Sequence, residues 1–297
     1  MKYKIAIIGG TGLLGSNLLK LYSSHDVISF SRMNAMNIDN SKNIIINFSF
    51  LERDLTKHFG SWKPDIIINA VGLVNLQLCE ENFSLAYDVN VRIAKELALI
   101  SSKLDIYFIH ISTDHYYNDL KTKHNEKDEV LFLNYYSKTK YEAEIEVLKN
   151  YHKTLVVRTN IIGFRNNNVD SFFEWLIKSM INKKSINLFS NFYTSPISVR
   201  ELGDILLKCF DKKLKGIYNI SSTEVIDKYN FGIKTASKFS LTTDSISKSE
   251  INENDTSSLR RALTLGLDVS KIENVLNIKM PTIDETLDRL YCEYKGK

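Results

Sequence analysis

The chain has 297 residues, and its 43% hydrophobic and 25% charged residues are ordinary for a globular protein of one or two domains. Its 39 basic and 35 acidic residues give a net charge of +4 and alternate along the chain, which excludes the basic stripe of a nucleic-acid-binding protein. The low content of 3 prolines and 12 glycines excludes collagen-like and disordered classes.

Signals for export, membrane insertion and metal binding are missing from the sequence. The first apolar run, Ile5 to Ile8, is too short for a signal-peptide core, and no stretch has transmembrane length. The cysteines, Cys79, Cys209 and Cys292, are odd in number and lack a Cys-x-x-Cys pair or nearby histidines at ligand spacing. We therefore expect a cytoplasmic protein with no metal site, in which the cysteines are buried apolar side chains.

The first half of the chain alternates short β-branched runs with amphipathic segments. The expected strands are Tyr3–Ile8, Val27–Phe30, Ile44–Ile46, Ile66–Ile68, Ile106–Ile111 and Leu155–Val157. The expected helices between them include Leu13–Tyr22, Ser84–Ser101 and Tyr135–Lys149, whose apolar residues recur every three or four positions. Continuous apolar strands fit a sheet that is covered on both faces, so the pattern predicts an α/β, Rossmann-type doubly wound parallel sheet.

The pattern loosens after about residue 160. Expected helices and strands there are Ser171–Ile181, Ile186–Phe189, Arg200–Phe210, Gly216–Ile220, Asp227–Phe239 and Ile283–Tyr294, with a surface loop over Thr242–Ser258. There is no internal repeat or low-complexity linker. We therefore expect a sheet domain over residues 1–160, to which some later segments return, and mainly a smaller C-terminal lobe over residues 161–297.

A glycine-rich turn follows the first expected strand. Gly9, Gly12 and Gly15 stand at Gly-x-x-Gly-x-x-Gly spacing, where the chain must turn tightly, approach a pyrophosphate and let a helix pack on a strand. The N-terminus of the next helix offers unpaired N–H groups to phosphates. This position in the first βαβ unit favours a dinucleotide-binding domain over a turn without a ligand.

The end of the second expected strand bears on the choice of dinucleotide. An acidic residue there would favour NAD, but the chain has Ser31 and Arg32 instead. An arginine can pair with a 2′-phosphate, so we expect NADPH, with NADH still open. The alternative is that Arg32 is simply a solvated surface residue.

A tyrosine and a lysine are spaced for proton transfer. Tyr136 and Lys140 lie four residues apart on one face of an expected helix. A nearby ammonium lowers the pKa of a tyrosine, which is ordinarily near 10, so the pair can pass a proton to a carbonyl oxygen. Tyr135 competes for this role, but its lysine, Lys138, is only three residues away. Such spacing also occurs by chance on helix surfaces.

Two hydroxyl residues, Ser112 and Thr113, end the strand that precedes this helix. One of them can hydrogen-bond a substrate oxygen and orient it for the tyrosine. The alternative role for a strand-end hydroxyl is a helix cap or a loop anchor.

Together, these motifs resemble the extended short-chain dehydrogenase/reductase superfamily and, more narrowly, the dTDP-4-dehydrorhamnose reductase family. The register holds to about residue 200 and is weaker beyond it. The matching strings are Gly9-Gly-Thr-Gly-Leu-Leu-Gly, Lys63-Pro-Asp-Ile-Ile-Ile-Asn-Ala, His110-Ile-Ser-Thr-Asp, Leu133-Asn-Tyr-Tyr-Ser-Lys-Thr-Lys, Arg158-Thr and Phe192-Tyr-Thr-Ser-Pro.

The resemblance implies a role for each matching residue. Thr113 orients the substrate, Tyr136 donates the proton and Lys140 contacts the cofactor. Asn90 links its helix to the active site, and Asn47 stands in a turn near adenine where the family has an aspartate. The implied cofactor-binding residues are Gly9, Thr11, Gly12, Leu13, Leu14, Gly15, Ser31, Arg32, Asn47, Phe48, Ala70, Val71, Gly72, Tyr136 and Lys140.

The sequence departs from the family pattern where the substrate is expected. The implied substrate-binding residues are Ser112, Thr113, Asp114, His115 and Ile161. His115 replaces a tyrosine and Ile161 replaces an aromatic residue, which leaves the identity of the sugar open. The chain also lacks the Asp-Glu pair that follows the threonine in sugar-nucleotide 4,6-dehydratases. His115 is either a second acid or base or, as loop histidines usually are, a hydrogen-bonding or solvated residue.

The resemblance implies an enzyme, an NAD(P)H-dependent reductase of a 4-keto group on a nucleotide-activated deoxysugar, in surface polysaccharide or glycan precursor synthesis. Two alternatives are a sugar-nucleotide epimerase with tightly bound NAD(P) and a non-catalytic nucleotide-binding regulatory subunit of the same fold. The expected partner is the nucleotide-sugar substrate, with no nucleic acid and no membrane, and a homodimer is left open.

Overall fold

The computed structural model describes residues 1–33, 43–117, 119, 121–165, 169–252 and 259–296. It divides into two compact units. The first comprises Met1–Thr113, Asn134–Arg158 and Gly203–Tyr218, and the second comprises Asp114–Leu133, Thr159–Leu202 and Asn219–Lys297. Residues 114–133 thus leave the first unit before residue 160, and residues 203–218 return to it.

The first unit is built on a seven-stranded sheet in the order β11-β6-β5-β4-β1-β2-β3. Its strands are β1 Lys4–Ile8, β2 Asp26–Ser31, β3 Asn43–Ile45, β4 Ile66–Asn69, β5 Tyr107–Ile111, β6 Thr154–Arg158 and β11 Gly216–Asn219. The pairings from β6 to β3 are parallel. The strand order reverses between β1 and β4, and in such sheets a ligand crevice opens at the carboxyl ends beside this point. The predicted doubly wound sheet is confirmed.

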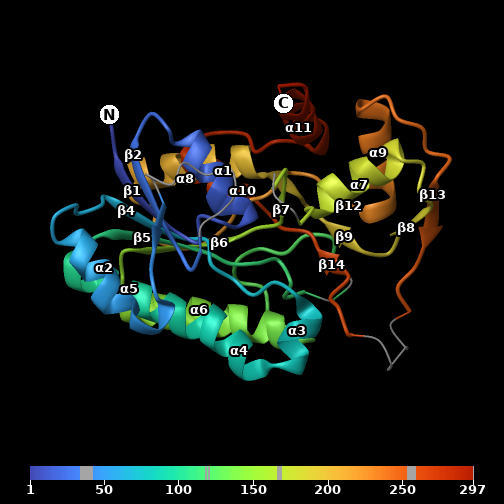
Figure 1. Ribbon diagram of the computed structural model, residues 1–297. Helices are drawn as coiled ribbons and strands as arrows, with labels where there is room; N and C mark the ends of the chain where they lie inside the picture. The colour runs from blue at the N-terminus through green and yellow to red at the C-terminus, as the bar shows by residue number, and fades with distance from the viewer. Residues whose placement is uncertain (34–42, 118, 120, 166–168, 253–258, 297) are drawn as a thin grey trace. The chain divides into compact units, whose positions relative to one another are not determined.

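Helices cover both faces of this sheet, which explains its uniformly apolar strands. Figure 1 shows α2 (Leu51–Phe59), α5 (Ile93–Leu104) and α6 (Tyr135–Asn150) along one face, and α1 (Leu13–Leu21) and α8 (Val199–Asp211) along the other. The four residues Ile5 to Ile8 are 0% exposed, because side chains on both faces of β1 are packed under helices.

The segment between β4 and β5 differs from its prediction. A single helix was expected over Ser84–Ser101, but the structure has α4 (Phe83–Tyr87), a π-helical turn η3 (Asp88–Arg92) and then α5, after a short α3 (Leu76–Glu81). A π-turn widens the helix by one residue and is common at functional sites. Here it contains Asn90 and Arg92.

In its described residues, the second unit contains short strands and four complete helices. The strands are β7 Ile161–Ile162, β8 Ile186–Phe189, β9 Tyr193–Thr194, β10 Ile197–Ser198, β12 Ile226–Asp227, β13 Ile246–Ser249 and β14 Thr264–Leu265. The helices are α7 Phe172–Ile181, α9 Lys228–Lys238, α10 Ser270–Leu276 and α11 Ile283–Lys295. Phe173, Phe231 and Leu287 from α7, α9 and α11 meet in one apolar core, which buries the stripe that made each helix recognisable.

Two further expectations are corrected. The loop expected over Thr242–Ser258 contains β13, which pairs in parallel with β8, while residues 253–258 lie outside the described part of the chain. Cys79 and Cys209 are buried as expected, but Cys292 is exposed because it lies on the outer side of the C-terminal helix.

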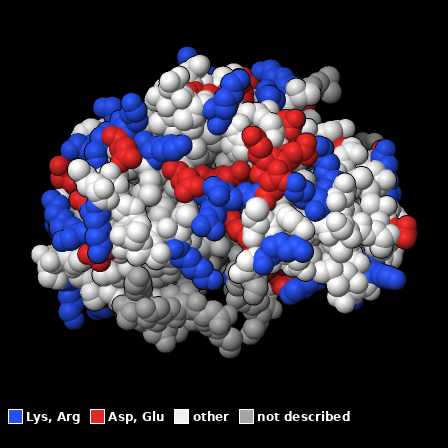
Figure 2. Space-filling model, turned by 90° about the horizontal axis from the view of Figure 1, so that it is seen from above, with Lys and Arg blue, Asp and Glu red and all other residues white. Residues whose placement is uncertain are grey.

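Surface charge, helix length and the grouping of possible metal ligands can be compared with the expectation of no nucleic acid, membrane or metal partner. On the face drawn in Figure 2, lysine and arginine side chains occur in small groups with acidic side chains among them, and they form no continuous stripe there. Within the described ranges, no helix combines the length and the apolar character needed to cross a membrane. In the same ranges, histidine, cysteine and carboxylate side chains form no group that could hold a metal ion.

Candidate active site

The glycine turn after β1 depends on the absence of side chains. Gly9 has a φ of +96°, and a Cβ there would lie 3.1 Å from the backbone of Ala70. A Cβ on Gly15 would lie 2.3 Å from the Gly9 carbonyl oxygen, so the first turn of α1 rests directly on the loop. Gly12 is the N-cap of α1 and supplies no side-chain cap. The turn therefore leaves N–H groups of the helix N-terminus available to an anion.

A cleft of about 840 Å³ lies in the first unit at this turn. The predicted residues that line it are Gly9, Thr11, Gly12, Ser31, Arg32, Asn47, Phe48, Ala70, Val71 and Gly72. Its lining also includes Met33, Ile45, Ile46, Ser49, Leu73, Leu78, Leu85, Asp88, Val89, Arg92 and Ile93, which sequence reasoning missed. Leu13, Leu14, Gly15, Tyr136 and Lys140 are not among the lining residues. Gly15 instead lies outside the lining and lets the first turn of α1 pack against the Gly9 carbonyl oxygen.

The ends of β2 and β3 form one wall of this cleft. The buried Ser31 hydroxyl lies 2.9 Å from Asn43 Oδ1 and 2.7 Å from the Met33 carbonyl oxygen, which fixes the turn. Arg32, the next residue, is exposed in the wall. Asn47 caps the short helix η2 (Phe48–Phe50), because its Oδ1 accepts a 2.9 Å hydrogen bond from Ser49 N. The amide at this position therefore shapes the turn next to Arg32.

Arg92 is a cleft residue that the sequence did not reveal. Its Nη1 donates to the Phe48 carbonyl oxygen at 3.1 Å and to Glu96 Oε1 at 2.9 Å. Its Nε donates to Asp88, and this hydrogen bond raises the pKa of Arg92. Arg92 therefore holds the turn after β3 against the π-turn. An arginine in a predicted surface helix gives no sign of this, because the contact depends on the π-turn.

The loop after β4 is held by two buried polar residues. Asn69 Oδ1 accepts a 3.1 Å hydrogen bond from Val71 N, and Asn69 Nδ2 lies 3.1 Å from His110 Nδ1. Burial, reinforced by the charge of Lys140, lowers the pKa of His110 well below its usual value. The neutral His110 thus orients Asn69, and Asn69 orients the loop that lines the cleft.

Asn90 links this loop to α6, as the resemblance implies. Its Oδ1 accepts a 2.8 Å hydrogen bond from Leu73 N, and its Nδ2 donates to Thr139 Oγ1 at 3.0 Å. Asn90 is 1% exposed, so both contacts are shielded from water. The π-turn therefore connects the cleft loop to the helix that carries Tyr136 and Lys140.

Helix α6 carries the predicted proton-transfer pair. Asn134 caps it by accepting a 2.9 Å hydrogen bond from Ser137 N, which places Tyr136 in the first turn and Lys140 one turn later. Lys140 Nζ donates a 2.8 Å hydrogen bond to the carbonyl oxygen of Ile111, the last residue of β5. Burial lowers the pKa of Lys140 to about 8, and the Glu144 carboxylate opposes this shift. Lys140 thus ties α6 to the strand end that precedes Ser112 and Thr113.

The remaining predicted substrate residues lie in the second unit. Asp114 is 1% exposed, and its Oδ2 accepts a 2.7 Å hydrogen bond from Asn160 Nδ2. Burial, together with the charges of Lys228 and Arg261, lowers the pKa of His115 to about 4. At neutral pH His115 is therefore uncharged. Ile161 is half-buried in β7.

Comparison with known proteins finds relatives with several different names over most of the chain. The spore coat polysaccharide biosynthesis protein SpsK of Bacillus subtilis is 26% identical over 232 residues, which cover 77% of this chain and 76% of that protein. The dTDP-4-dehydrorhamnose reductase of Aggregatibacter actinomycetemcomitans is 26% identical over 244 residues, which cover 77% of each chain. Methionine adenosyltransferase 2 subunit beta of Xenopus laevis is 25% identical, with 91% of this chain and 81% of that protein covered.

The solved structures agree on the fold. The crystal structure of dTDP-4-dehydrorhamnose reductase from Bacillus anthracis, in complex with NADP, superposes with a TM-score of 0.80 over 99% of this chain and 100% of that one. The two sequences are 20% identical, so this likeness supports the fold alone. The family model for the RmlD substrate binding domain matches residues 3–295, and the chain therefore belongs to the RmlD substrate binding domain family.

Proposed function

We propose that this protein is an NADPH-dependent reductase that converts the 4-keto group of a nucleotide-activated deoxysugar to an alcohol, in surface polysaccharide or glycan precursor synthesis. One observation carries the proposal. Tyr136 and Lys140 lie one turn apart on α6, and the 2.8 Å bond from Lys140 to Ile111 holds that turn against the strand end at Thr113. The names of the relatives support the same class of substrate.

The residues around the cleft fit a bound dinucleotide. Gly9 and Gly15 let the turn pack closely against the loop after β4 and against α1, because a Cβ on either would meet the chain's own backbone. Beside Gly12 the only atom within 4 Å of an added Cβ is the Gly9 carbonyl oxygen, so a pyrophosphate could approach there and the N-terminus of α1 would hold it. Arg32 would pair with a 2′-phosphate, and the Asn47 turn would border adenine. The loop Ala70–Gly72 would border the nicotinamide half. When bound, NADPH supplies the hydride for the carbonyl carbon.

The chain itself would manage the proton. The Thr113 hydroxyl would donate a hydrogen bond to the keto oxygen and orient it. The Tyr136 phenol would then give its proton to that oxygen as negative charge develops on it. With a pKa of about 8, Lys140 is mostly protonated at neutral pH, so its ammonium stabilises the phenolate that remains and can hold a ribose hydroxyl. Solvent would return the proton to Tyr136 after release of the product.

The experiment that tests this function is a panel of 4-keto sugar nucleotides, with oxidation of NADPH and of NADH followed for each. Oxidation of NADPH by at least one of them is expected. Cofactor that stays bound through purification, with no net NADPH consumption, would indicate an epimerase. Binding of NADPH without any turnover would indicate a nucleotide-binding subunit. The relative that is named as a subunit of methionine adenosyltransferase supports this alternative.

Compartment and assembly complete the proposal. We place the reaction in the cytoplasm, because Cys79, Cys209 and Cys292 are unpaired, as is usual in a reducing compartment. For the assembly, which the sequence leaves open, we propose a homodimer. Light scattering of the purified protein should give twice the mass of one chain, and the mass of a single chain would refute the dimer.

A further inference from the structure

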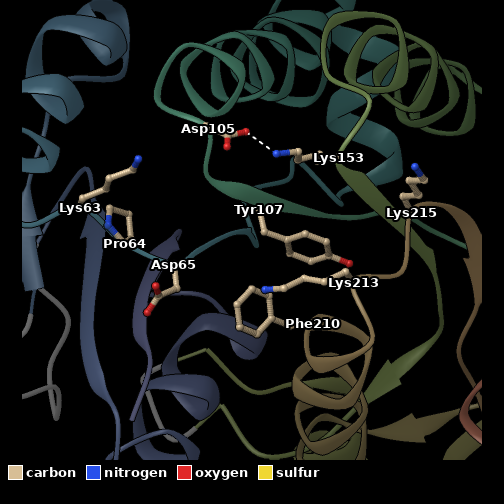
Figure 3. A pocket seen from close by; sticks show the side chains of 9 residues that line it. All are labelled: Lys63, Pro64, Asp65, Asp105, Tyr107, Lys153, Phe210, Lys213 and Lys215. Atoms are coloured by element: carbon tan, nitrogen blue, oxygen red, sulfur yellow. Dashed lines mark hydrogen bonds and ion pairs between the residues drawn. The ribbon is translucent and has the colours of Figure 1, made fainter. Parts of the chain in front are cut away.

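A second pocket, of about 690 Å³, lies in the first unit at the edge of the sheet where the strands begin. Figure 3 shows the side chains that line it, and these are Lys63, Pro64, Asp65, Asp105, Tyr107, Lys153, Phe210, Lys213 and Lys215. Most of them lie just before or at the start of β4, β5, β6 and β11, which are neighbours in the sheet, while Phe210 lies at the end of α8 and Lys213 just after it. The glycine turn follows β1 at the carboxyl edge, so this pocket is separate from the dinucleotide cleft.

The pocket has an excess of positive charge. Four lysines and two aspartates line it, which leaves a formal charge of 4 − 2 = +2. Both aspartates are already engaged within the protein. Asp105 Oδ1 binds Lys153 Nζ at 2.7 Å, and Asp65 Oδ2 accepts a 2.8 Å hydrogen bond from the backbone N–H of Lys4, the first residue of β1.

Three of the lysines lack such partners. Among the residues that the structure describes, Lys63, Lys213 and Lys215 make no side-chain hydrogen bond or ion pair. In Figure 3, Lys63 and Lys215 lie on opposite sides of the pocket, and Lys213 lies between them alongside the Phe210 ring. Three ammonium groups on one concave surface repel one another, and an anion would relieve that repulsion.

The inner wall of the pocket is aromatic. The rings of Tyr107 and Phe210 meet edge to face with centroids 5.3 Å apart, and both residues are more than nine-tenths buried. Lys213 Nζ lies 3.2 Å from the centroid of the Phe210 ring. Partial burial lowers the pKa of Lys213, and the charges of Asp65 and Asp211 oppose this shift without forming an ion pair with it among the described residues. An apolar wall of this kind also strengthens the attraction between the lysines and a bound anion.

We propose that this pocket binds a small phosphate-bearing anion, with Lys63, Lys213 and Lys215 as its cationic ligands and the Tyr107–Phe210 wall behind it. A phosphate group carries enough negative charge to balance the excess of the pocket, and ammonium groups bind phosphate as point charges without a fixed geometry. The volume of about 690 Å³ exceeds that of phosphate alone, so the phosphate group of an organic phosphomonoester also fits.

A purely structural role for these lysines makes a different prediction. Helices end at this edge of a doubly wound sheet, and basic side chains there offset the negative ends of the helix dipoles. Lysines with only that role would bind no anion saturably. Binding measurements therefore separate the two roles.

The test is isothermal titration of inorganic pyrophosphate into the full chain, with and without saturating NADP⁺. NADP⁺ is present because pyrophosphate could also occupy the glycine turn. We expect one saturable site that persists with NADP⁺. Lys213→Gln and Lys215→Gln should each weaken it roughly fivefold, from the loss of one nearby charge. The matched control is Lys57→Gln, an exposed lysine of α2 outside the pocket, which should change nothing.

Further arms identify the source of the anion and keep the test decisive. Tighter binding of a sugar phosphate than of pyrophosphate would indicate an organic phosphomonoester, and the reverse would indicate the free anion. Asp65→Asn should tighten binding, since it removes a negative charge. If NADP⁺ does not bind, weaker binding of pyrophosphate by the lysine variants still identifies the pocket as the site. Absence of saturable heat, or unchanged binding in a folded Lys213→Gln/Lys215→Gln double variant, would overturn the proposal.

Discussion

The carboxylate of Glu144, on α6, accepts a 2.7 Å hydrogen bond from Arg158 Nη2 at the end of β6, and the two side chains are 1% and 2% exposed. Glu144 Oε1 also lies 2.5 Å from the Ser112 hydroxyl oxygen. Glu144 therefore connects α6 to the end of β6 and to Ser112. Helix α6 carries Tyr136 and Lys140, and Ser112 precedes Thr113. A buried charge that loses its partner is costly, so this connection resists distortion.

Replacing Glu144 should destabilise the protein strongly. Glu144→Gln removes the counter-charge that Glu144 supplies to the buried Arg158 guanidinium, at a cost of about 3 kcal/mol in the free energy of unfolding. The matched control is Glu146→Gln on the same helix, which breaks a partly exposed ion pair with Lys95 and should cost less than about 1 kcal/mol. Urea denaturation of both variants measures the difference. Equal losses would show that burial of the Glu144–Arg158 pair does not matter.

Two glycines of the turn should differ in their tolerance of alanine. Gly15→Ala places a Cβ 2.3 Å from the Gly9 carbonyl oxygen, so it should cost about 2 kcal/mol in unfolding free energy and weaken NADPH binding. At Gly12 the nearest atom to a new Cβ is 3.5 Å away, and φ is −80°. Gly12→Ala should therefore leave stability within about 1 kcal/mol of the parent. Thermal denaturation and NADPH fluorescence titration test both, and a stable Gly15→Ala variant would contradict the packing argument.

The sheet could be read from the sequence because its strands are buried on both faces. Runs such as Ile66–Ile68 have no polar position, and the structure places β4 at Ile66–Asn69. The missed strand β13 has the sequence Ile-Ser-Lys-Ser and mostly exposed or half-buried residues, so it has no apolar pattern. Its pairing with β8, some 60 residues away, is a tertiary contact that local propensity does not encode.

The glycine turn that lines the cleft was also predictable, because glycines at fixed spacing reveal backbone geometry directly. The resemblance to the short-chain dehydrogenase/reductase superfamily is confirmed at the level of the RmlD family. Arg92 and Asp88 could not be found, since their place in the cleft depends on a π-turn that has no sequence signature. The proton-transfer roles of Tyr136 and Thr113 remain predictions.

Arg32 should determine the choice of cofactor. It is exposed in the wall of the cleft directly after β2, at the strand end where an acidic residue would favour NAD. Arg32→Ala should weaken NADPH binding roughly tenfold, the loss expected for a hydrogen bond to a charged group, and leave NADH binding nearly unchanged. Arg53→Ala, an exposed arginine of α2, is the control. Equal losses for both cofactors would contradict a 2′-phosphate contact.

The buried ammonium of Lys140 should leave a mark on the pH dependence of stability. Burial holds its pKa at about 8, below the usual value near 10.5, so between these values the unfolded chain binds more protons than the folded one. The contribution of Lys140 to the free energy of unfolding should therefore rise as pH increases from about 8 to about 10.5. The difference in unfolding free energy between the parent and Lys140→Met isolates it. A difference that is flat over this range would contradict the burial of a titrating amine.

The same group should limit activity at high pH. As pH rises above about 8, Lys140 loses the charge that stabilises the Tyr136 phenolate, and the rate of keto-sugar reduction should fall. A pH profile of kcat/KM in the parent enzyme shows this limb. A rate that keeps rising to pH 10 would contradict the role given to the ammonium.

The central claim is that the phenol of Tyr136 donates the proton, and the most direct measurement is the turnover of Tyr136→Phe with a keto-sugar nucleotide. The account predicts that kcat falls at least roughly a hundredfold, the usual contribution of a general acid, while NADPH still binds with parental affinity. The matched control is Tyr135→Phe, which removes the exposed neighbouring phenol and should stay within about twofold of the parent. Parental turnover by Tyr136→Phe, or an equal loss in both variants, would contradict the claim.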